Sequence, residues 1–504
     1  MAADMGQPHP PTLQQSVVAL FAKDSLKYFS ARVVQAILGV VSTYAFTRLL
    51  SAAAYGDYSL ALGVVTPLLA LISEWAAQPA ARFFRQYEVE GRKSTYTRVF
   101  LVLLAGVLFL AFVSALVLSW AASAAWGRSL VLAASAMILV DSVFAVLGSI
   151  LPVSQQGGAY RTLQVSRAAV LLLTSVGFVR LFGPTGSALL WGGAVSGAIV
   201  LVPTTRMALR ALGPWGGKEG VQTWLPNWTH LSRFLWYGLP MMVWFFGSQL
   251  LALGDRFVIG LFRGSAEVGV YAASYNVVNS LTQVLAGPIL FAASPIIWRL
   301  WAESSRAEVQ KAIADISGWF VTLGAGLVGG LGLLASDVFT VLLGPDFHGG
   351  FPIVFPVALG TTVWNLAMIG QKALELMERT TVLMWVSLGS ALVNVMLNFT
   401  LVPGFGMMGA AYATLVSYVL YALAVGVLAK VTGLVWSLPL DRALAAVAAA
   451  IVAFLVTSHV MLAGVVGAII RGILFSALYV ASLGGLLLLF RRVSRSRLRR
   501  SDDR

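Results

Sequence analysis

The chain has 504 residues, of which 59% are hydrophobic and 11% are charged, and its formal net charge is +14. Soluble domains are about 45–50% apolar and about 25% charged, so this composition excludes an ordinary soluble protein and predicts one that spans a membrane. The absence of cysteine excludes disulfides, thiol catalysis and thiolate metal sites, and the four histidines lack the spacing of zinc or haem ligands.

Residues 1–24 are expected to form a cytoplasmic N-terminal segment, since they lack the apolar stretch and cleavage site of a secretory signal peptide. Apolar runs of about 20 residues then predict an all-α integral membrane protein with about fourteen transmembrane helices. The predicted spans are 25–49, 54–80, 99–121, 129–152, 161–182, 184–207, 232–262, 266–294, 313–335, 351–376, 379–401, 406–430, 439–461 and 463–490.

Basic residues set the expected orientation, because Lys and Arg concentrate in cytoplasmic loops. With the N-terminus inside, the basic residues that fall on the outer side are Arg48, Arg128, Arg180, Arg256, Arg263 and Arg471. The even number of spans puts the basic tail, residues 491–504, on the inner side too. We therefore interpret the positive charge as membrane topology and not as nucleic-acid binding.

Two inner segments are longer than the other connections. Residues 211–231 form a Gly/Pro/Trp-rich cytoplasmic connector at mid-chain. Residues 298–317 can place Trp298, Trp301, Val309, Ile313 and Ile316 on one apolar face, which predicts an interfacial helix or a salt-bridged loop helix.

A short sequence occurs twice. Residues 47–61 read "TRLLSAAAYGDYSLA", and residues 259–275 read "IGLFRGSAEVGVYAASY". Each has a Gly followed two places later by a Tyr, at Gly56/Tyr58 and Gly269/Tyr271. We expect the glycines in tight turns at the outer ends of equivalent helices, with the tyrosines as interfacial anchors.

The sixth and twelfth spans also echo one another, because each opens with a G-x-x-G sequence, at Gly183 and at Gly406. The repeats predict two parallel six-helix lobes with a substrate site between them. The expected lobes are residues 25–210 and 232–430, followed by two additional helices in residues 439–490.

These sequences, together with "AARFFRQYE" (80–88) and "LNFTLVPGFGMMGAAYATLVSY" (397–418), resemble the polysaccharide transporter, or oligosaccharide flippase, family. That family belongs to a superfamily that also holds multidrug antiporters and the lipid II flippase. The resemblance implies a flippase that moves a polyprenyl-diphosphate-linked glycan to the outer leaflet by alternating access, driven by a proton or sodium gradient. It implies a monomer in a bacterial or archaeal plasma membrane, with other polysaccharide assembly proteins as candidate partners and no cofactor.

A lipid diphosphate needs cationic partners inside the membrane, and arginine can grip phosphate oxygens with two donors at once. Arg32, two turns into the first span, is the leading candidate. Further candidates are Lys27, Arg82, Arg233 and Lys372. The alternative for such residues is that their long side chains reach the inner membrane surface.

Acidic residues within spans are rarer. Glu74 in the second span and Asp141 in the fourth are candidate sites for ion coupling, or else members of an ion pair or hydrogen bond within the first lobe, such as Glu74 with Arg32. Asp255 and Arg256, near the outer end of the seventh span, are expected to form a cap or gate.

Neutral amides suit sugar hydroxyls but also suit bonding between helices. The candidates are Asn276, Asn279 and Asn365. A multidrug or cation antiporter and a lipid II flippase stay open as alternatives. A glycan polymerase or ligase is disfavoured, because the longest outer segment, residues 336–350, offers little catalytic material, and no enzymatic activity is expected.

Overall fold

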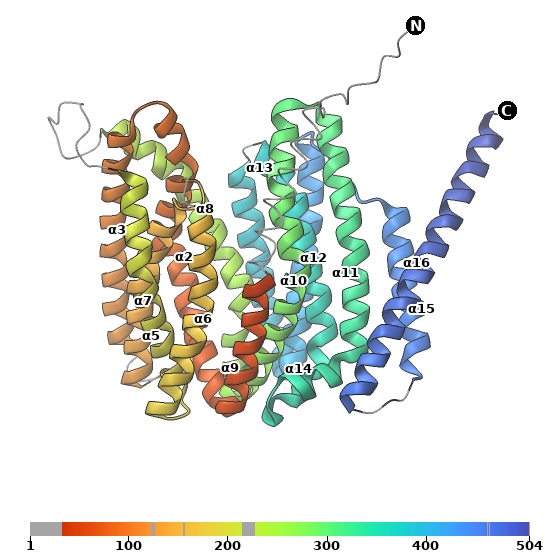
Figure 1. Cartoon of the computed structure of the whole chain (residues 1–504), viewed down its shortest axis with the longest axis horizontal. Coiled ribbons are helices and arrows are strands. Elements are labelled where there is room, and N and C mark those ends of the chain that lie inside the picture. Colours follow the sequence, from red (N-terminus) through yellow and green to blue (C-terminus); the bar gives the residue numbers. More distant parts are fainter. Residues whose placement is uncertain are drawn as a thin grey trace, which may run out of the picture.

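The computed structural model describes residues 33–121, 127–154, 157–213, 227–377, 379–460, 462 and 464–502. Every regular element in these residues is helical, and most helices run the length of the molecule (Figure 1). The elements are α2 (Ala52–Val89), α3 (Lys93–Ala121), α5 (Arg128–Ser149), α6 (Gly157–Phe182), α7 (Gly186–Leu212), α8 (Trp228–Leu253), α9 (Asp255–Arg263), α10 (Ser265–Glu303), α11 (Arg306–Leu342), the 3₁₀ helix η1 (Pro345–Ile353), α12 (Val354–Gly370), α13 (Lys372–Leu376), α14 (Thr380–Val431), α15 (Leu440–Ser458) and α16 (Gly464–Asp502).

The predicted number of spans is confirmed. Twelve helical segments are long and apolar enough to cross a membrane, and the shorter apolar helix Val33–Leu49 precedes them. Helix α14 contains two of the predicted spans, because Gly406 interrupts it with a non-helical backbone at φ 54°. Counting α14 twice therefore gives fourteen apolar helices in the described residues.

The helices form two lobes and a C-terminal pair. Following the predicted division of the chain, we call helix Val33–Leu49 and helices α2 to α7 the N-terminal lobe and α8 to α14 the C-terminal lobe, and Phe234 of α8 packs in the cluster of the N-terminal lobe. Figure 1 shows α2, α3, α5, α6 and α7 on one side of α10 to α14, with α8 beside α2, and α15 and α16 beyond α11. We name the end of the molecule that carries Ser51, Gly264 and Gly344 the hinge end, and the end that carries the α2–α3 and α10–α11 connections the basic end.

The C-terminal pair packs on α11 through a row of glycines. The Tyr479 ring on α16 occupies the space of a side chain at Gly326, because an added Cβ atom there would lie 2.9 Å from the ring. The Phe475 ring on α16 does the same at Gly329, at 2.8 Å. The Tyr479 hydroxyl also donates a hydrogen bond to the Thr322 carbonyl. These contacts attach the two additional helices to the C-terminal lobe.

The lobes share a hydrophobic core at the hinge end. One buried cluster contains Phe46, Leu50 and Tyr55 of the N-terminal lobe together with Tyr271 and Phe347 of the C-terminal lobe. Towards the basic end the buried clusters are separate, one mainly in the N-terminal lobe and others in the C-terminal lobe. The lobes therefore share a core at the hinge end, and α8 also packs closely on α2 towards the basic end, where a Cβ atom added to Gly238 would lie 2.0 Å from the Trp75 carbonyl oxygen.

The interfacial helix expected in residues 298–317 is absent. Trp298 and Trp301 lie in the last turns of α10, which ends at Glu303, and Val309 lies in α11. The break is only two residues long because Ser305 forms a capping box with Glu308 that starts α11 at once. Both helices simply extend further than their apolar cores predict.

The two G-x-x-G sequences occupy equivalent places in the two lobes. A Cβ atom added to Gly186, at the start of α7, would lie 2.7 Å from the Ala54 carbonyl oxygen. In the other lobe the Met407 amide donates to the Glu267 carboxylate at 2.6 Å. Ala54 and Glu267 hold matching positions in the two copies of the repeated stretch. In each lobe, the sixth predicted span therefore packs on that lobe's own copy of the stretch.

Candidate functional site

The two copies of the repeated stretch meet each other across the lobes at the hinge end. A Cβ atom added to Gly56 in α2 would lie 1.8 Å from the Ser265 carbonyl oxygen, and one added to Gly269 in α10 would lie 1.8 Å from the Ala52 carbonyl oxygen. The contact is reciprocal, because Ala52 and Ser265 occupy matching positions in the two stretches, as at a twofold interface between identical subunits. We call this α2–α10 contact the seam.

The roles predicted for the glycines and tyrosines of the repeated stretch are wrong in two respects. Gly56 and Gly269 lie within helices and not in turns, and their lack of a side chain serves helix–helix contact. Tyr271 is fully buried and is no interfacial anchor, because its hydroxyl donates to the Asp255 carboxylate. Tyr58 is half-buried.

A buried polar network crosses the seam beside the glycines. Arg256, which is 4% exposed, donates to the Ser59 hydroxyl at 2.8 Å and to the Asn276 amide oxygen at 3.4 Å. Asn276 in turn donates to the Tyr55 hydroxyl at 3.1 Å. Ser59 and Tyr55 belong to α2, and Arg256 and Asn276 belong to the C-terminal lobe, so the network links the lobes where a gate would stand.

Asp255 lies behind this network in a fully buried oxygen-rich cluster. Its Oδ2 atom accepts a hydrogen bond from Tyr271 and another from the Thr414 hydroxyl at 3.4 Å. The Asn394 amide donates to Thr414 at 3.3 Å, and the Asn398 amide donates to Asn394. Within the described residues, Asp255 Oδ1, Asn398 Oδ1 and the Nε of the neighbouring Arg256 are buried without a hydrogen-bond partner.

Helix α2 carries a polar face that becomes more exposed towards the basic end. Glu74 and Gln78 are half-buried and joined by a 2.8 Å hydrogen bond, and Arg82 and Arg85 are exposed. These residues follow each other at three- and four-residue spacing on one side of the helix. Charged side chains within membrane spans face water or protein and not lipid.

Helix α10 carries a neutral polar face. Asn276, Asn279 and Gln283 are half-buried, and Gln283 donates to the amide oxygen of the buried Asn365 at 3.4 Å. A Cβ atom at Gly39 of the first helix would lie 3.1 Å from the Ser280 hydroxyl, so this face lies against the first helix. The amides expected to contact sugar therefore belong to one polar region, although Asn276 and Asn365 are also engaged in bonds between helices.

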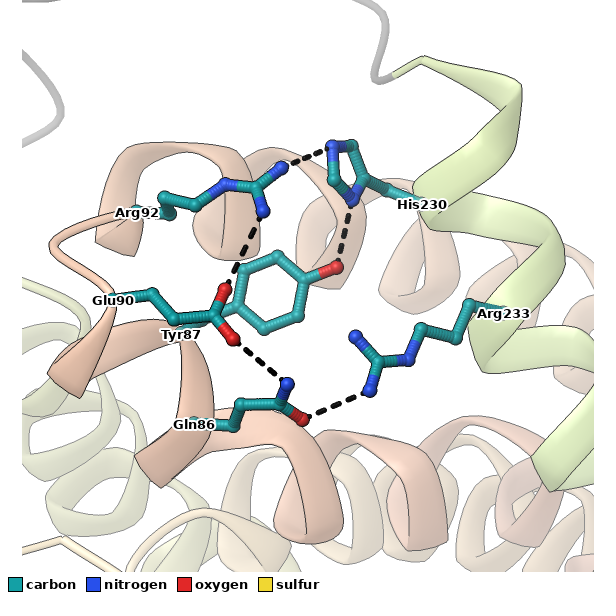
Figure 2. Close-up of polar contacts among 6 residues, drawn as sticks. All are labelled: Gln86, Tyr87, Glu90, Arg92, His230 and Arg233. Atoms are coloured by element: carbon teal, nitrogen blue, oxygen red, sulfur yellow. Dashed lines mark hydrogen bonds and ion pairs between the residues drawn. The ribbon is translucent and has the colours of Figure 1, made fainter.

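Helix α8 joins the two lobes. Figure 2 shows its first turns against the end of α2, where the Tyr87 hydroxyl and Arg92 each lie 2.8 Å from a ring nitrogen of His230. Arg233 donates to the Gln86 amide oxygen at 3.0 Å and stacks on Phe83. Beyond Pro240 the same helix packs on α14, where Ser387 donates to the Trp244 carbonyl.

The remaining basic candidates lie at the basic end or outside the described residues. Lys372 forms a 2.6 Å ion pair with Glu375, three residues further along the chain. Arg82 is exposed on α2. Arg32 and Lys27 lie outside the described residues, so their expected place on the first helix stays a prediction.

Asp141 forms an ion pair with Arg167 at 2.7 Å, between α5 and α6 of the N-terminal lobe. An ion pair within this lobe is the predicted alternative to ion coupling, and residue spacing alone does not identify Arg167 as the partner. Glu74 accepts its hydrogen bond from Gln78. Whether either carboxylate couples transport to an ion stays a prediction.

Several residues of this region were not among the candidates, namely Tyr55, Ser59, Thr414 and His230. Small hydroxyl residues are common in transmembrane helices, so Ser59 and Thr414 carry no signal by themselves. Tyr55 lies inside the repeated stretch, which is the feature that could have pointed to it.

Two lobes of long apolar helices, which meet at a buried polar seam and are also joined by α8, define a multi-pass membrane transporter fold. The chain belongs to the family described as "Polysaccharide biosynthesis protein", which matches residues 21–301.

Two curated proteins of archaea are similar to part of the chain. The probable flippase AglR of Haloferax volcanii is 28% identical over 260 residues, which cover 50% of this chain and 49% of that protein. The uncharacterized membrane protein MJ1068 of Methanocaldococcus jannaschii is 21% identical over 301 residues, or 57% of each chain. The matched part thus spans about half the length of these relatives.

Solved transporter structures share the fold over nearly their whole length. The lipid II flippase MurJ in an inward closed conformation superposes with a TM-score of 0.71 at 13% identity, covering 94% of this chain and 99% of that one. An inward-facing multidrug transporter of the MATE family and MOP superfamily gives a TM-score of 0.62 at 11% identity, covering 81% and 98%. At these identities the likeness concerns the fold alone.

Proposed function

We propose that this protein is a flippase that moves a polyprenyl-diphosphate-linked oligosaccharide from the inner to the outer leaflet of the plasma membrane by alternating access. The observation that carries the proposal is the seam, where the lobes touch through Gly56 and Gly269 while polar faces of α2 and α10 continue towards the basic end. The family described above and the flippase among the relatives support this function.

The polar faces suit a substrate with a charged and hydroxylated head. A diphosphate carries a charge of about −2, and its passage through hydrocarbon without polar partners is prohibitively costly. Arg82, Arg233 and Lys372, with Arg32 and Lys27, would attract the diphosphate at the basic end. Asn279, whose amide is half-buried, and the neighbouring amides of α10 would accept and donate hydrogen bonds to sugar hydroxyls. The polyprenyl tail would stay in the bilayer.

Opening the hinge end requires the seam to separate. Separation breaks the bonds from Arg256 to Ser59 and from Asn276 to Tyr55, and it uncovers the Asp255 cluster beside them. We place ion coupling at this cluster, because carboxylate, hydroxyl and amide oxygens are the ligands that hard cations prefer. A cation bound to Asp255 would then bias the equilibrium between the closed and the open seam.

The orientation and the mode of action belong to the same proposal. The basic end is cytoplasmic by the positive-inside rule, which puts both chain termini in the cytoplasm and the seam on the outer side. The protein works as a monomer, since one chain contains both lobes, and its task is translocation and not catalysis.

The test is reconstitution of the purified chain in liposomes that contain a polyprenyl-diphosphate disaccharide with a fluorescent label on the sugar. Dithionite added outside destroys the label in the outer leaflet, so translocation appears as additional loss of fluorescence over protein-free liposomes. We expect this loss to depend on an imposed sodium or proton gradient and Asp255→Asn to remove that dependence. Fluorescence loss equal to that of protein-free liposomes would overturn the proposal.

The two alternatives are tested in the same vesicles. A multidrug or cation antiporter would drive ethidium against its gradient and leave the labelled glycan lipid in place. A lipid II flippase would translocate a labelled lipid II analogue in preference to the disaccharide lipid.

A further inference from the structure

His230 lies between two polar partners where the first turn of α8 meets the end of α2 (Figure 2). The Tyr87 hydroxyl lies 2.8 Å from its Nδ1 atom, and Arg92 Nη2 lies 2.8 Å from its Nε2 atom. A guanidinium can only donate hydrogen bonds, so Nε2 must accept and carries no proton. The proton of the neutral ring is therefore on Nδ1, which donates to Tyr87. We call these two contacts of His230 the latch, and both are made only while the histidine is neutral.

The charged groups around the latch leave no free carboxylate for a protonated histidine. Glu90 pairs with Arg92 at 3.4 Å and accepts a hydrogen bond from Gln86 at 2.8 Å. Arg233, three residues along α8 from His230, also donates to Gln86. The other charged side chains at this end of α2 pair among themselves, namely Arg85 and Lys93 with Glu88. Protonation of His230 would remove the bond from Arg92 and leave two cations 2.8 Å apart.

The latch lies beside an apolar contact between α8 and the N-terminal lobe. Phe234 is fully buried in this contact, and its ring centre lies 4.8 Å from that of Phe83. The ring centres of Tyr87 and Tyr96 lie 5.9 and 6.0 Å from it. Beyond Pro240, α8 packs on α14 of the C-terminal lobe instead. If the lobes move apart at the basic end, α8 must therefore leave either α2 or α14.

We infer that the latch is sensitive to pH, so that neutral His230 holds the first turns of α8 on α2 and protonated His230 releases them. Histidine is the side chain whose charge ordinarily changes between about pH 5 and 8. Release leaves α8 attached to α14 alone, so that it moves with the C-terminal lobe. In the orientation proposed above the latch faces the cytoplasm, and a fall in cytoplasmic pH would release it. Only this assignment to the cytoplasm rests on the proposed function.

The test is ¹⁹F NMR of the full-length protein in detergent with the single change Phe234→4-fluorophenylalanine. Three aromatic rings surround this side chain while the latch is closed, so the closed and released states should give separate signals. A soluble gadolinium chelate should broaden only the released signal. Because one proton is taken up, a fall of about two pH units can change the ratio of released to closed signal by up to about a hundredfold, and we expect a rise of at least about tenfold. A ratio that stays constant would overturn the inference.

Two variants should remove the response to pH without removing the contact. The neutral amide in His230→Gln can accept from Arg92 and donate to Tyr87 at every pH, and the amide in Arg92→Gln can donate to neutral His230 or accept from protonated His230. A response like that of wild type in either variant would overturn the inference. His459→Gln, at an exposed histidine after α15, is the matched control and should respond like wild type. The same label at the buried Phe475 should not respond, and a response there would show a global change and overturn the latch.

The outcome is distinguishable from failure of the proposed function, because the NMR signal does not depend on transport. If the signal at Phe234 responds to pH through His230 but the labelled glycan lipid stays in the inner leaflet, the flippase proposal fails and the latch stands. If the protein translocates the glycan lipid while the signal stays constant with pH, the latch alone fails.

Discussion

Replacing either seam glycine with alanine should push the hinge end open. An added Cβ atom at Gly56 or Gly269 would lie 1.8 Å from a backbone oxygen of the other lobe, which falls about 1.6 Å short of the ordinary 3.4 Å contact. The obstructing atoms belong to helical backbone and cannot rotate away, so the lobes themselves must separate. Overpacking of this kind costs about 1–3 kcal/mol, which shifts a two-state equilibrium about 5-fold to 150-fold.

The natural absence of cysteine gives a direct assay. Ser59 is 1% exposed beside the glycines, so a cysteine at this position should react with a membrane-impermeant maleimide only when the seam opens. We expect Ser59→Cys to label slowly alone, and at least fivefold faster when combined with Gly56→Ala or Gly269→Ala. Glycan-lipid translocation should fall in the same variants, because the closed state becomes less populated.

Gly177→Ala is the matched control. This glycine also lies within a helix, but nothing stands within 4 Å of an added Cβ atom. The change should leave labelling of Ser59→Cys and translocation as in wild type. If Gly56→Ala and Gly269→Ala behaved like Gly177→Ala, the reasoning that the lobes meet backbone to backbone would be refuted.

Three further predictions concern single contacts. His230→Phe keeps a ring against Tyr87 but removes both hydrogen bonds, so thermal unfolding in detergent should show a loss of about 1–2 kcal/mol; an unchanged midpoint would contradict this. Arg471→Met leaves Asp337 without its 2.6 Å partner between α16 and α11, at side chains only 18% and 21% exposed, and should destabilise by about 1–3 kcal/mol; adding Asp337→Asn should recover part of the loss. Arg32→Ala should abolish translocation in a folded and inserted protein, with partial activity in Arg32→Lys, and full activity in Arg32→Ala would exclude the expected role of this residue.

The number of helices, the fold class and the presence of two lobes could be predicted from the sequence because they depend on local properties. A run of apolar residues long enough for the bilayer is visible without any knowledge of its neighbours. The repeated stretch and the paired G-x-x-G sequences likewise reveal duplication by comparison of the chain with itself. The breaks between helices are harder to predict from the sequence. The break at Ser304 and Ser305 lies inside a segment whose pattern predicts one amphipathic helix, because a two-residue break leaves little trace in hydropathy.

What only the tertiary structure decided is which residues meet. Asp141 could pair with any cation at its depth, and its contact with Arg167 follows from how α5 and α6 are placed in the lobe. The repeat identified Gly56 and Gly269 as equivalents, but it could not make them partners. They touch because both lie near the axis that relates the two lobes, and equivalent points near a twofold axis come together while all others are carried apart. The sequence by itself therefore determined the two lobes, and their packing about a shared axis turned a duplicated stretch into one contact.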